Sequence, residues 1–586
     1  MTQELANDSP GAGAPAAAVT QAAALRAVDL ARRVIEQGSD DPGVFIALGA
    51  AILAAGAPAE AVDWLRAEAA RRGTDARIWF QLGRVARGEE AVEAYGRAIA
   101  LAPRSSSALI NRANLLAAAG RLSEAMADYR RAYVAAPGAP AALFSLAVAL
   151  RDNGLHDEAL ELFRKGGADV SASADMHSRY LLGLTRSGSI SREAVFQAHL
   201  RFGARFGRGE GTSHANPATT DRRLKIGYVS GDLASHTVID FVEPMFAHHD
   251  PDVVDLHVYS TRGGDHGQVR RHVPNWRDVA HLDDDRLTAL VRDDGIDILV
   301  DLSGHTGANR LSVFARKPAP VQVSFVGYPN TTGLKEIDYR LSDSFTAGEE
   351  TQVFLCETLY RLPGAGTCYR PFTGVDVSAP PSLARRWITF AAPHTPSKLN
   401  DAVFDAWAAI LGEIPDSRLL LKYRGLDDPG VAGRISAALV GRGVGPEQLS
   451  FEGPSSFEDY LRAYAGVDIV LDSFPYTGGT TTRNALWMGV PVISLRGPAL
   501  YERISSGLLA AAGLEADCVA DSRPAYVEKA VSLARDRGRL AALRADLRPR
   551  LLESGYFDPP RFTSELETAY RDMWRRWCAG RTGAGS

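Results

Sequence analysis

The stretch DIVLDSFPYTGGTTTRNALWMGVPVISLRG, residues 468–497, contains an apolar strand, a turn rich in glycine and threonine, a helical segment and a second apolar strand. A strand–helix–strand unit of this kind is typical of a parallel sheet covered by helices. The preceding stretches RWITFAAP (386–393) and RLLLKYRG (418–425) add two more apolar strands. Residues 385–550 are therefore predicted to form a doubly wound, Rossmann-like half.

A second half of the same type precedes this one. Apolar strands again alternate with helical segments over residues 222–384, in KIGYVSG (225–231), VDLHVYS (254–260), DDGIDILVDLSG (293–304) and VQVSFVGYP (321–329). Open α/β sheets bind ligands beyond the carboxyl ends of their strands. Polar stretches follow the strands of both halves in this way, so we expect one cleft between the halves, lined by residues 230–236, 301–305, 328–332, 393–398 and 472–482.

The front of the chain repeats with a period of 34 residues. Pro103 and Pro137 are 34 residues apart, and so are Tyr95 and Tyr129. This is the period of tetratricopeptide repeats, in which helix pairs stack into a superhelix. We predict such an array over residues 22–167, with a concave face that binds an extended protein segment. A spacer or a dimerisation surface is the alternative.

Three further segments flank these parts. Residues 1–21 are rich in Ala, Gly and Pro, which predicts a disordered leader. Residues 168–221 start with amphipathic helices and end in a stretch of Gly, Ser, Thr and Asn, so we interpret them as a helical cap and a linker. Residues 551–586 contain an amphipathic helix and a loose tail. The expected fold class is α + α/β, a helical superhelix followed by two Rossmann-like halves.

Composition excludes several classes of function. The 586 residues include 65 basic and 70 acidic ones, and a net charge of −5 argues against binding of nucleic acid or anionic membranes. Four scattered cysteines without CxxC spacing fit neither a disulfide framework nor a zinc site. No apolar run reaches the roughly 18 residues of a membrane span, and no signal-peptide pattern is present. We expect a soluble, cytoplasmic protein.

Three stretches carry more specific motifs: DLSGHTGANRLSVFARKPAPVQVSFVGYPNTTGLKEIDYRLSD (301–343), FAAPHTPSKLND (390–401) and residues 468–497. Together they resemble the catalytic region of glycosyltransferase family 41, which includes the O-linked N-acetylglucosamine transferases and the SPINDLY-type O-fucosyltransferases. The resemblance implies a GT-B fold whose final helix crosses back to the first half. It also implies inverting transfer of a sugar from a nucleotide donor to a protein, with neither a metal ion nor another cofactor.

The resemblance assigns catalytic roles to four residues. Lys398 matches a lysine at the donor phosphate, where a cation offsets the charge of the leaving nucleotide; a solvated lysine is the alternative. His236 matches a histidine beside the sugar and diphosphate, and His305 with Asp301 matches a second polar cluster. Either histidine can donate a hydrogen bond to the nucleotide sugar or relay a proton from the attacking hydroxyl. Histidines satisfied by the backbone are the alternative, and the general base stays open.

A phosphate site is expected where the helix of the opening stretch begins. The backbone N–H groups of Gly479, Thr480, Thr481 and Thr482 can point at a phosphate, with the helix dipole behind them. Capping of an ordinary core helix is the alternative. Asp472 either orients this turn or forms a structural Asx turn.

Five further residues bear on the donor. The resemblance places Tyr328 and Pro329 at the cleft, with a β-turn as the alternative. Asn484 stands where the O-linked N-acetylglucosamine transferases have an aspartate for the ribose, so it lacks the charge-assisted part of that hydrogen bond. His394 and Thr395 replace an Asn/Gln pair of those enzymes. The donor stays open among UDP-N-acetylglucosamine, a GDP-sugar and a CMP-nonulosonate.

The leading hypothesis is a bacterial-type protein O-glycosyltransferase. Its repeat array would hold a protein acceptor, for which the resemblance to bacterial relatives suggests flagellin or another surface protein. Its cleft would move a sugar to Ser or Thr of that acceptor. Two alternatives stay open: a tetratricopeptide scaffold whose transferase-like half binds nucleotide without catalysis, and a GT-B sugar-nucleotide epimerase acting on small molecules.

Overall fold

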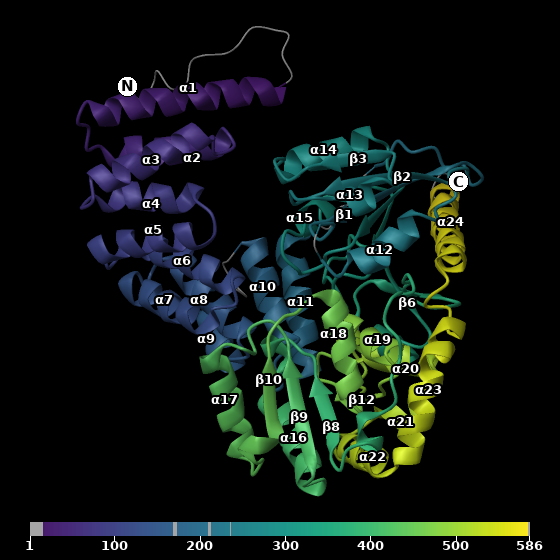
Figure 1. Cartoon of the computed structure of the whole chain (residues 1–586). Coiled ribbons are helices and arrows are strands. Elements are labelled where there is room, and N and C mark those ends of the chain that lie inside the picture. Colours follow the sequence, from purple (N-terminus) through teal and green to yellow (C-terminus); the bar gives the residue numbers. More distant parts are fainter. Residues whose placement is uncertain (1–15, 168–172, 209–212, 235, 584–586) are drawn as a thin grey trace. The chain divides into compact units, whose positions relative to one another are not determined.

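The computed structural model describes residues 16–167, 173–208, 213–234 and 236–583 (Figure 1). Its contacts divide the chain into two units, residues 1–150 and 151–586, which we term the helical unit and the sheet unit. Residues 1–15 of the predicted disordered leader lie outside the described residues. Residues 16–21 already belong to the first helix, so the leader does not extend to residue 21.

The helical unit is a series of helices, most of which pack on the next helix along the chain, while α2 packs on α1 and α4. Proline or a glycine in the left-handed region begins or ends several of them, which sets the sharp turns of the array. The helices are α1 (Ala16–Glu36), α2 (Pro42–Ala54), α3 (Ala59–Arg71), α4 (Ala76–Val85), α5 (Gly88–Leu101), α6 (Ser106–Ala118), α7 (Leu122–Ala135) and α8 (Pro140–Asp152), the last of which continues into the sheet unit.

Small residues let the paired helices approach closely. A Cβ atom on Gly83 of α4 would lie only 2.8 Å from the ring of Tyr95 on α5. The hydroxyl of Tyr95 accepts a hydrogen bond from the side chain of Asn111 on α6, at 3.1 Å. One tyrosine therefore packs against its own helix pair and bonds to the next pair. This arrangement explains why glycine and tyrosine recur with the repeat period.

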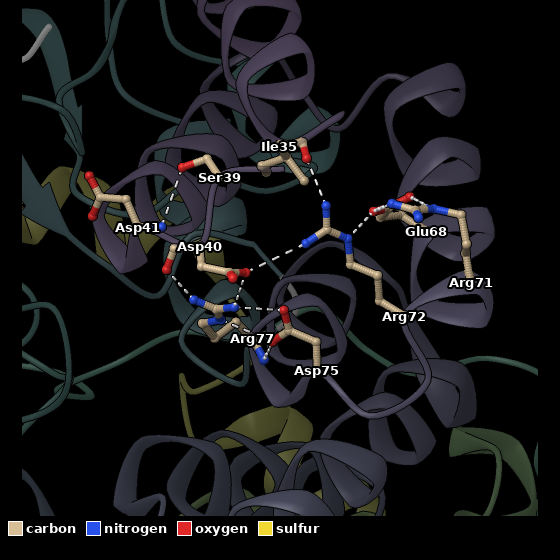
Figure 2. Close-up of polar contacts among 9 residues, drawn as sticks. All are labelled: Ile35, Ser39, Asp40, Asp41, Glu68, Arg71, Arg72, Asp75 and Arg77. Carbon is tan, nitrogen blue, oxygen red and sulfur yellow. Dashed lines mark hydrogen bonds and ion pairs between the residues drawn. The ribbon is translucent and has the colours of Figure 1, made fainter. Parts of the chain in front are cut away.

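Two arginines tie the first turns of the array together (Figure 2). Arg72 donates to the carbonyl oxygen of Ile35 at 2.7 Å. Arg77 donates to the carboxylate of Asp75 at 2.9 Å and to that of Asp40 at 3.0 Å. These bonds join the turn after α1 to the turn after α3. Because the carboxylate of Asp40 is exposed, we expect its pairing with Arg77 to fix the stacking of successive helix pairs more than to add stability.

Three connecting helices, α9 (His156–Lys165), α10 (Ala174–Leu184) and α11 (Arg192–Phe206), open the sheet unit. By its sequence pattern α9 completes the last repeat, but its contacts group it with the sheets, because the division falls within α8. The contacts thus place the division ahead of the predicted boundaries at residues 167/168 and 221/222, which stay predictions. The reason is that the connecting helices pack on loops of both sheets, as described below.

The first sheet has seven parallel strands in the order β3-β2-β1-β4-β5-β6-β7. The order reverses between β1 and β4, whose residues are fully or almost fully buried. The strands are β1 (Leu224–Ser230), β2 (Val254–Ser260), β3 (Asn275–Asp278), β4 (Ile298–Asp301), β5 (Val321–Ser324), β6 (Tyr339–Asp343) and β7 (Thr358–Leu362), and the helices that cover them are α12 (Ile239–Phe246), α13 (Gly267–Arg270), α14 (Asp284–Asp293) and α15 (Leu311–Phe314).

The second sheet has six parallel strands in the order β10-β9-β8-β11-β12-β13, and this order reverses between β8 and β11. The strands are β8 (Ile388–Ala392), β9 (Ser417–Lys422), β10 (Leu449–Glu452), β11 (Ile469–Leu471), β12 (Val492–Leu495) and β13 (Val519–Ala520). The helices are α16 (Asp401–Glu413), α17 (Pro429–Val440), α18 (Phe457–Ala463), α19 (Thr480–Trp487), α20 (Ile504–Ala511), α21 (Glu515–Cys518), α22 (Arg523–Arg535) and α23 (Arg537–Glu553). The predicted fold class, helical repeats followed by two Rossmann-like halves, is confirmed.

The last helix, α24 (Pro559–Gly583), follows the second sheet in sequence but packs on the first. The hydroxyl of Tyr570 lies 3.0 Å from that of Tyr228 on β1, and the indole of Trp574 donates to the carbonyl oxygen of Thr219 at 3.0 Å. This crossing fastens the end of the chain to the first half. Within the described ranges, no helix is both long enough and apolar enough to cross a membrane.

Candidate active site

A cavity of about 350 Å³ lies where the loops of the two sheets meet. Its walls include the loops after β1 and β5 of the first sheet and those after β8 and β11 of the second, which flank the points where the strand orders reverse. Six of the predicted site residues line it: His236, Pro329, Thr395, Lys398, Gly479 and Thr480. The cleft expected between the halves is thus present.

Lys398 reaches the cavity from the loop after β8. Its ammonium donates to the carbonyl oxygen of Thr477 at 2.7 Å and lies 4.6 Å from the ring centre of Tyr476. Burial lowers the pKa of Lys398 to about 8, although the carboxylate of Asp472 acts in the opposite direction. The side chain is therefore a poorly hydrated cation near neutral pH, which is suited to binding a phosphate.

The turn before α19 is shaped by Asp472. One carboxylate oxygen accepts from the backbone N–H of Gly478 at 2.8 Å, and the other accepts from the hydroxyl of Ser494 at 2.7 Å. This holds the start of α19, where Gly479 and Thr480 line the cavity. Asp472 itself does not line the cavity, so its side chain orients the turn.

Two of the three threonines at the start of α19 do not line the cavity. The hydroxyl of Thr482 lies 2.7 Å from that of Ser505 and is buried. Neither Thr481 nor Thr482 is among the residues that line the cavity. The wall of the predicted phosphate site is thus formed by Gly479 and Thr480.

His236 lies at the open side of the cavity. Nearly half of its side chain is exposed, and Nδ1 accepts a hydrogen bond from the backbone N–H of Val238 at 3.2 Å. Asp232 lies 3.9 Å from the same nitrogen. An imidazole that is held at one nitrogen and lines the cavity can present its other nitrogen to a donor or an acceptor hydroxyl.

His305 and Asp301 lie behind the cavity wall. Nε2 of His305 donates to the carbonyl oxygen of Thr332 and Nδ1 accepts from the hydroxyl of Ser178 on α10, both at 2.9 Å. The carboxylate of Asp301 accepts from backbone N–H groups, such as that of Gly304 at 3.0 Å. Burial lowers the pKa of His305 and raises that of Asp301. Neither residue lines the cavity, so this geometry supports positioning of the wall by both residues, and their catalytic role stays a prediction.

Tyr328 is turned toward the connecting helices. It is fully buried, and its hydroxyl bonds to Nε2 of His199 on α11 at 2.8 Å. A Cβ atom on Gly203 of the same helix would lie only 1.7 Å from the carbonyl oxygen of Gly333. Only Pro329 of the predicted Tyr-Pro pair lines the cavity, because the tyrosine anchors the loop to α11.

The side chains of Asn484 and His394 also form hydrogen bonds with other parts of the protein. The amide oxygen of Asn484 accepts two hydrogen bonds from Arg483, from Nη2 at 2.8 Å and from Nε at 3.0 Å, and Arg483 pairs with Asp240 of α12. His394 donates from Nε2 to the carbonyl oxygen of Leu471 at 3.0 Å, and burial lowers its pKa to about 4. Neither side chain lines the cavity, so their expected contacts with the donor lack support in this geometry.

Several lining residues were not predicted from the sequence. They include two cations and two aromatic rings from separate parts of the chain: Arg186, Arg340, Tyr369 and Tyr423. Arg340 lies in the stretch 301–343 quoted for the family resemblance, so that stretch was an available signal. Arg186 precedes every motif quoted above, and no pattern in the sequence distinguished it from a surface arginine of the helical cap.

No group of three or more His, Cys, Asp or Glu side chains that could hold a metal ion is found among the described residues.

The model of Glycosyl transferase family 41 matches residues 210–365 and 383–566, more than half of the chain. The chain belongs to glycosyl transferase family 41. A tetratricopeptide model matches residues 80–140 and 135–169. Both the family and the repeats predicted from the sequence are confirmed.

Relatives in family 41 include plant and bacterial proteins. The rice protein named probable UDP-N-acetylglucosamine–peptide N-acetylglucosaminyltransferase SPINDLY is 38% identical over 399 residues, which cover 66% of this chain and 43% of that protein. The Arabidopsis thaliana protein SEC, named for the same activity, is 31% identical over 376 residues, with 61% and 38% covered. The chain thus spans less than half the length of these curated relatives.

A solved structure shares the fold along most of the chain. It is a mutant of the Thermobaculum terrenum O-GlcNAc transferase, with a TM-score of 0.80 and 34% identity, and the match covers 89% of this chain and 98% of that one. Repeats and both halves are therefore arranged along the sequence as in that enzyme.

Proposed function

We propose that the protein is an inverting protein O-glycosyltransferase, which moves a sugar from a nucleotide donor to Ser or Thr of a protein acceptor. One observation carries this proposal: Lys398, the start of α19 at Thr480 and the imidazole of His236 line a single cavity between the two halves. A buried cation and a helix N-terminus suit the donor phosphate. The names of the relatives, peptide N-acetylglucosaminyltransferases, support the reaction class.

The reaction follows from this arrangement. The acceptor oxygen attacks the anomeric carbon from the face opposite the leaving phosphate, the bond from that carbon to the phosphate oxygen breaks, and the nucleotide departs with the bonding electrons. Lys398 and the N–H groups at the start of α19 offset the negative charge that develops on the phosphate. His236, at the open side, is placed to orient the acceptor hydroxyl or receive its proton. No step requires a metal ion, so we propose metal-independent transfer.

The repeat array is the proposed site of acceptor capture. Its support is the tetratricopeptide pattern, because such arrays bind extended polypeptides along their concave faces. We propose a protein from the same cell as acceptor and flagellin as the first candidate, which the resemblance to bacterial relatives suggests. UDP-N-acetylglucosamine is the donor that the relatives' names favour, and GDP- and CMP-linked sugars are the alternatives to test against it.

The test combines nucleotide binding with transfer. Purified protein is titrated with UDP, GDP and CMP, and the matching sugar nucleotide is then incubated with flagellin and with other proteins of the same cell, while intact mass reports the added sugar. Lys398→Ala should abolish transfer and weaken binding of the preferred nucleotide at least tenfold, whereas Lys335→Ala, at an exposed lysine, should change neither. Nucleotide binding without transfer to any protein would favour the scaffold alternative, and a modified free sugar nucleotide would favour the epimerase.

A further inference from the structure

The turn between the connecting helices α10 and α11 contributes an arginine to the wall of the cavity. Arg186 of this turn lines the cavity together with Lys398 and Tyr476. It lies outside the residues matched by the family 41 model and outside those matched by the tetratricopeptide model. The comparisons therefore assign it no role, although its side chain faces the same space as the lysine.

Arg186 and Lys398 share two neighbours. Nη1 of Arg186 donates to the hydroxyl of Ser397 at 2.7 Å, in the residue directly before the lysine. The guanidinium carbon lies 5.6 Å from the ring centre of Tyr476, and the ammonium of Lys398 lies 4.6 Å from the same ring. Two cations thus contact one aromatic ring. Each gains some cation–π attraction, yet the ring carries no net charge to neutralise them.

Neither cation has a carboxylate partner. Among the described residues no ion pair is formed by Arg186, Lys398 or Arg340, the third cation of the cavity, and Nε of Arg186 is buried without a hydrogen-bond partner. Burial lowers the pKa of Arg186, and the neighbouring charge of Arg151 lowers it further. Buried cations are normally paired because desolvation is costly. The missing counter-charge points to an anionic ligand.

The carboxylate that does line the cavity is already engaged. Asp343 accepts from the backbone N–H of Thr346 at 2.6 Å and from that of Gly366 at 2.7 Å, and its pKa is raised by burial. The hydroxyl of Tyr556 also donates to this carboxylate, at 3.3 Å. It therefore does not take the place of the missing counter-ion for Arg186 and Lys398.

The backbone holds Arg186 close to the lysine loop, which we define as residues 395–400. A Cβ atom on Gly154, in the turn before α9, would lie 2.6 Å from the carbonyl oxygen of Pro396. A Cβ atom on Gly188 would lie 2.9 Å from the side-chain oxygen of Asn400. Together with the bond from Arg186 to Ser397, these contacts flank Lys398 on both sides. The position of the guanidinium relative to the lysine is thus built into the fold.

We propose that Arg186 is a further donor-binding residue, which contacts the phosphate of the nucleotide donor together with Lys398. The inference rests on the proposed function, because it names a second cation for the same donor. It also makes the connecting helices part of the active site, so that the donor is bound by three parts of the chain: the two halves and the α10–α11 turn.

The first test measures nucleotide affinity without any acceptor. Arg186→Met keeps the length and apolar body of the side chain and removes its charge, and Arg179→Met, at an exposed arginine on α10, is the matched control. Whichever of UDP, GDP and CMP binds the unmodified protein most tightly should bind Arg186→Met about tenfold or more weakly. The corresponding nucleoside, which has no phosphate, should bind both proteins equally.

Two further variants separate phosphate contact from support of the loop. Arg186→Lys retains a charge and should show intermediate affinity, and it replaces Arg186→Met if the latter does not fold. Ser397→Ala removes the hydrogen-bond partner but leaves the cation, and should retain most of the affinity. Equal losses in Ser397→Ala and Arg186→Met would overturn the inference, because Arg186 would then act through the loop.

The outcomes also distinguish this inference from the proposed function. Tight nucleotide binding that is the same in the unmodified protein and Arg186→Met would overturn the inference alone and leave the proposed transferase intact. Failure of the unmodified protein to bind any of the three nucleotides would overturn the proposed function, and the inference with it.

Discussion

Tyr328 donates its hydroxyl hydrogen to Nε2 of His199, at 2.8 Å. The direction is fixed because the other ring nitrogen, Nδ1, must donate to the carbonyl oxygen of Val195 at 2.7 Å. Both side chains are fully buried. The pair therefore fastens the loop after β5, which lines the cavity through Pro329, to the connecting helix α11.

Tyr328→Phe should lower stability more than nucleotide affinity. The change leaves Nε2 of His199 buried without a donor, which costs about 1–3 kcal/mol. Denaturant unfolding should show this loss, and nucleotide titration should show little change, because the phenol does not line the cavity. Tyr133→Phe, at a partly exposed tyrosine of α7, serves as the control. Weaker nucleotide binding at unchanged stability would show that the hydroxyl contacts the donor after all.

Gly154→Ala should weaken nucleotide binding, whereas Gly120→Ala should not. The two glycines are 34 residues apart in equivalent turns, with φ angles of +77° and +82°. Alanine therefore meets the same backbone strain of about 1–2 kcal/mol at both. Only at Gly154 would the new Cβ atom also meet Pro396 of the lysine loop, at 2.6 Å. Unfolding and nucleotide titration of both variants measure the difference, and equal affinities would argue against support of the lysine loop by this turn.

Acid should destabilise the sheet unit before its carboxylates titrate. Burial lowers the pKa of His156 and of His199 to about 4 in the folded protein. Between that value and about 6.5 the unfolded state binds more protons, so stability falls as the pH falls through this window. Each histidine should account for about 1.5 kcal/mol between pH 6.5 and pH 5. The free energy of unfolding, measured over this range, should depend less steeply on pH for His156→Gln than for the control His281→Gln, at an exposed histidine.

Nucleotide affinity should fall above pH 8. With its pKa lowered to about 8 by burial, the ammonium of Lys398 loses its proton as the pH rises, and the phosphate loses its cation. The affinity should then decrease by up to tenfold per pH unit. Lys398→Arg should abolish this decrease, because a guanidinium stays protonated. Titrations from pH 7 to pH 9.5 give the comparison, and a parallel decrease in both proteins would assign it to another group.

The fold could be predicted from the sequence because its signals are local. Apolar strands that end in Gly or Asp indicated both sheets, and the 34-residue spacing of Pro103 and Pro137 indicated the array. Lys398 and His236 were also found, because each matches a family motif in the loop after a strand, and Thr480 was found because it begins a helix. The sequence did not indicate which motif side chains point into the cavity. His305 and Tyr328 occupy family motifs, yet they bind Ser178 and His199, more than 120 residues away.

Arg186 is the opposite case, a residue that lines the cavity but belongs to no motif. Its surroundings in the sequence are ordinary for a helix end, and its guanidinium bonds to Ser397, 211 residues later. No periodicity or motif joins two positions so far apart. The side-chain direction of Asn484 was also not predictable from the sequence. Its amide oxygen accepts a hydrogen bond from the neighbouring Arg483, which also pairs with Asp240.

The close approach of Gly154 to the lysine loop bears on where this protein can be cut. The similarity to family 41 begins at residue 210, which would be the natural start of a shortened protein. Such a fragment would lose Ser178, Arg186 and His199, and would expose the buried partners that they hold. A fragment that starts at Pro140, with α8, would keep every one of these contacts. Under the proposed function, removing or exchanging the repeats ahead of Pro140 should alter acceptor choice alone, whereas removing the last repeat should also weaken donor binding.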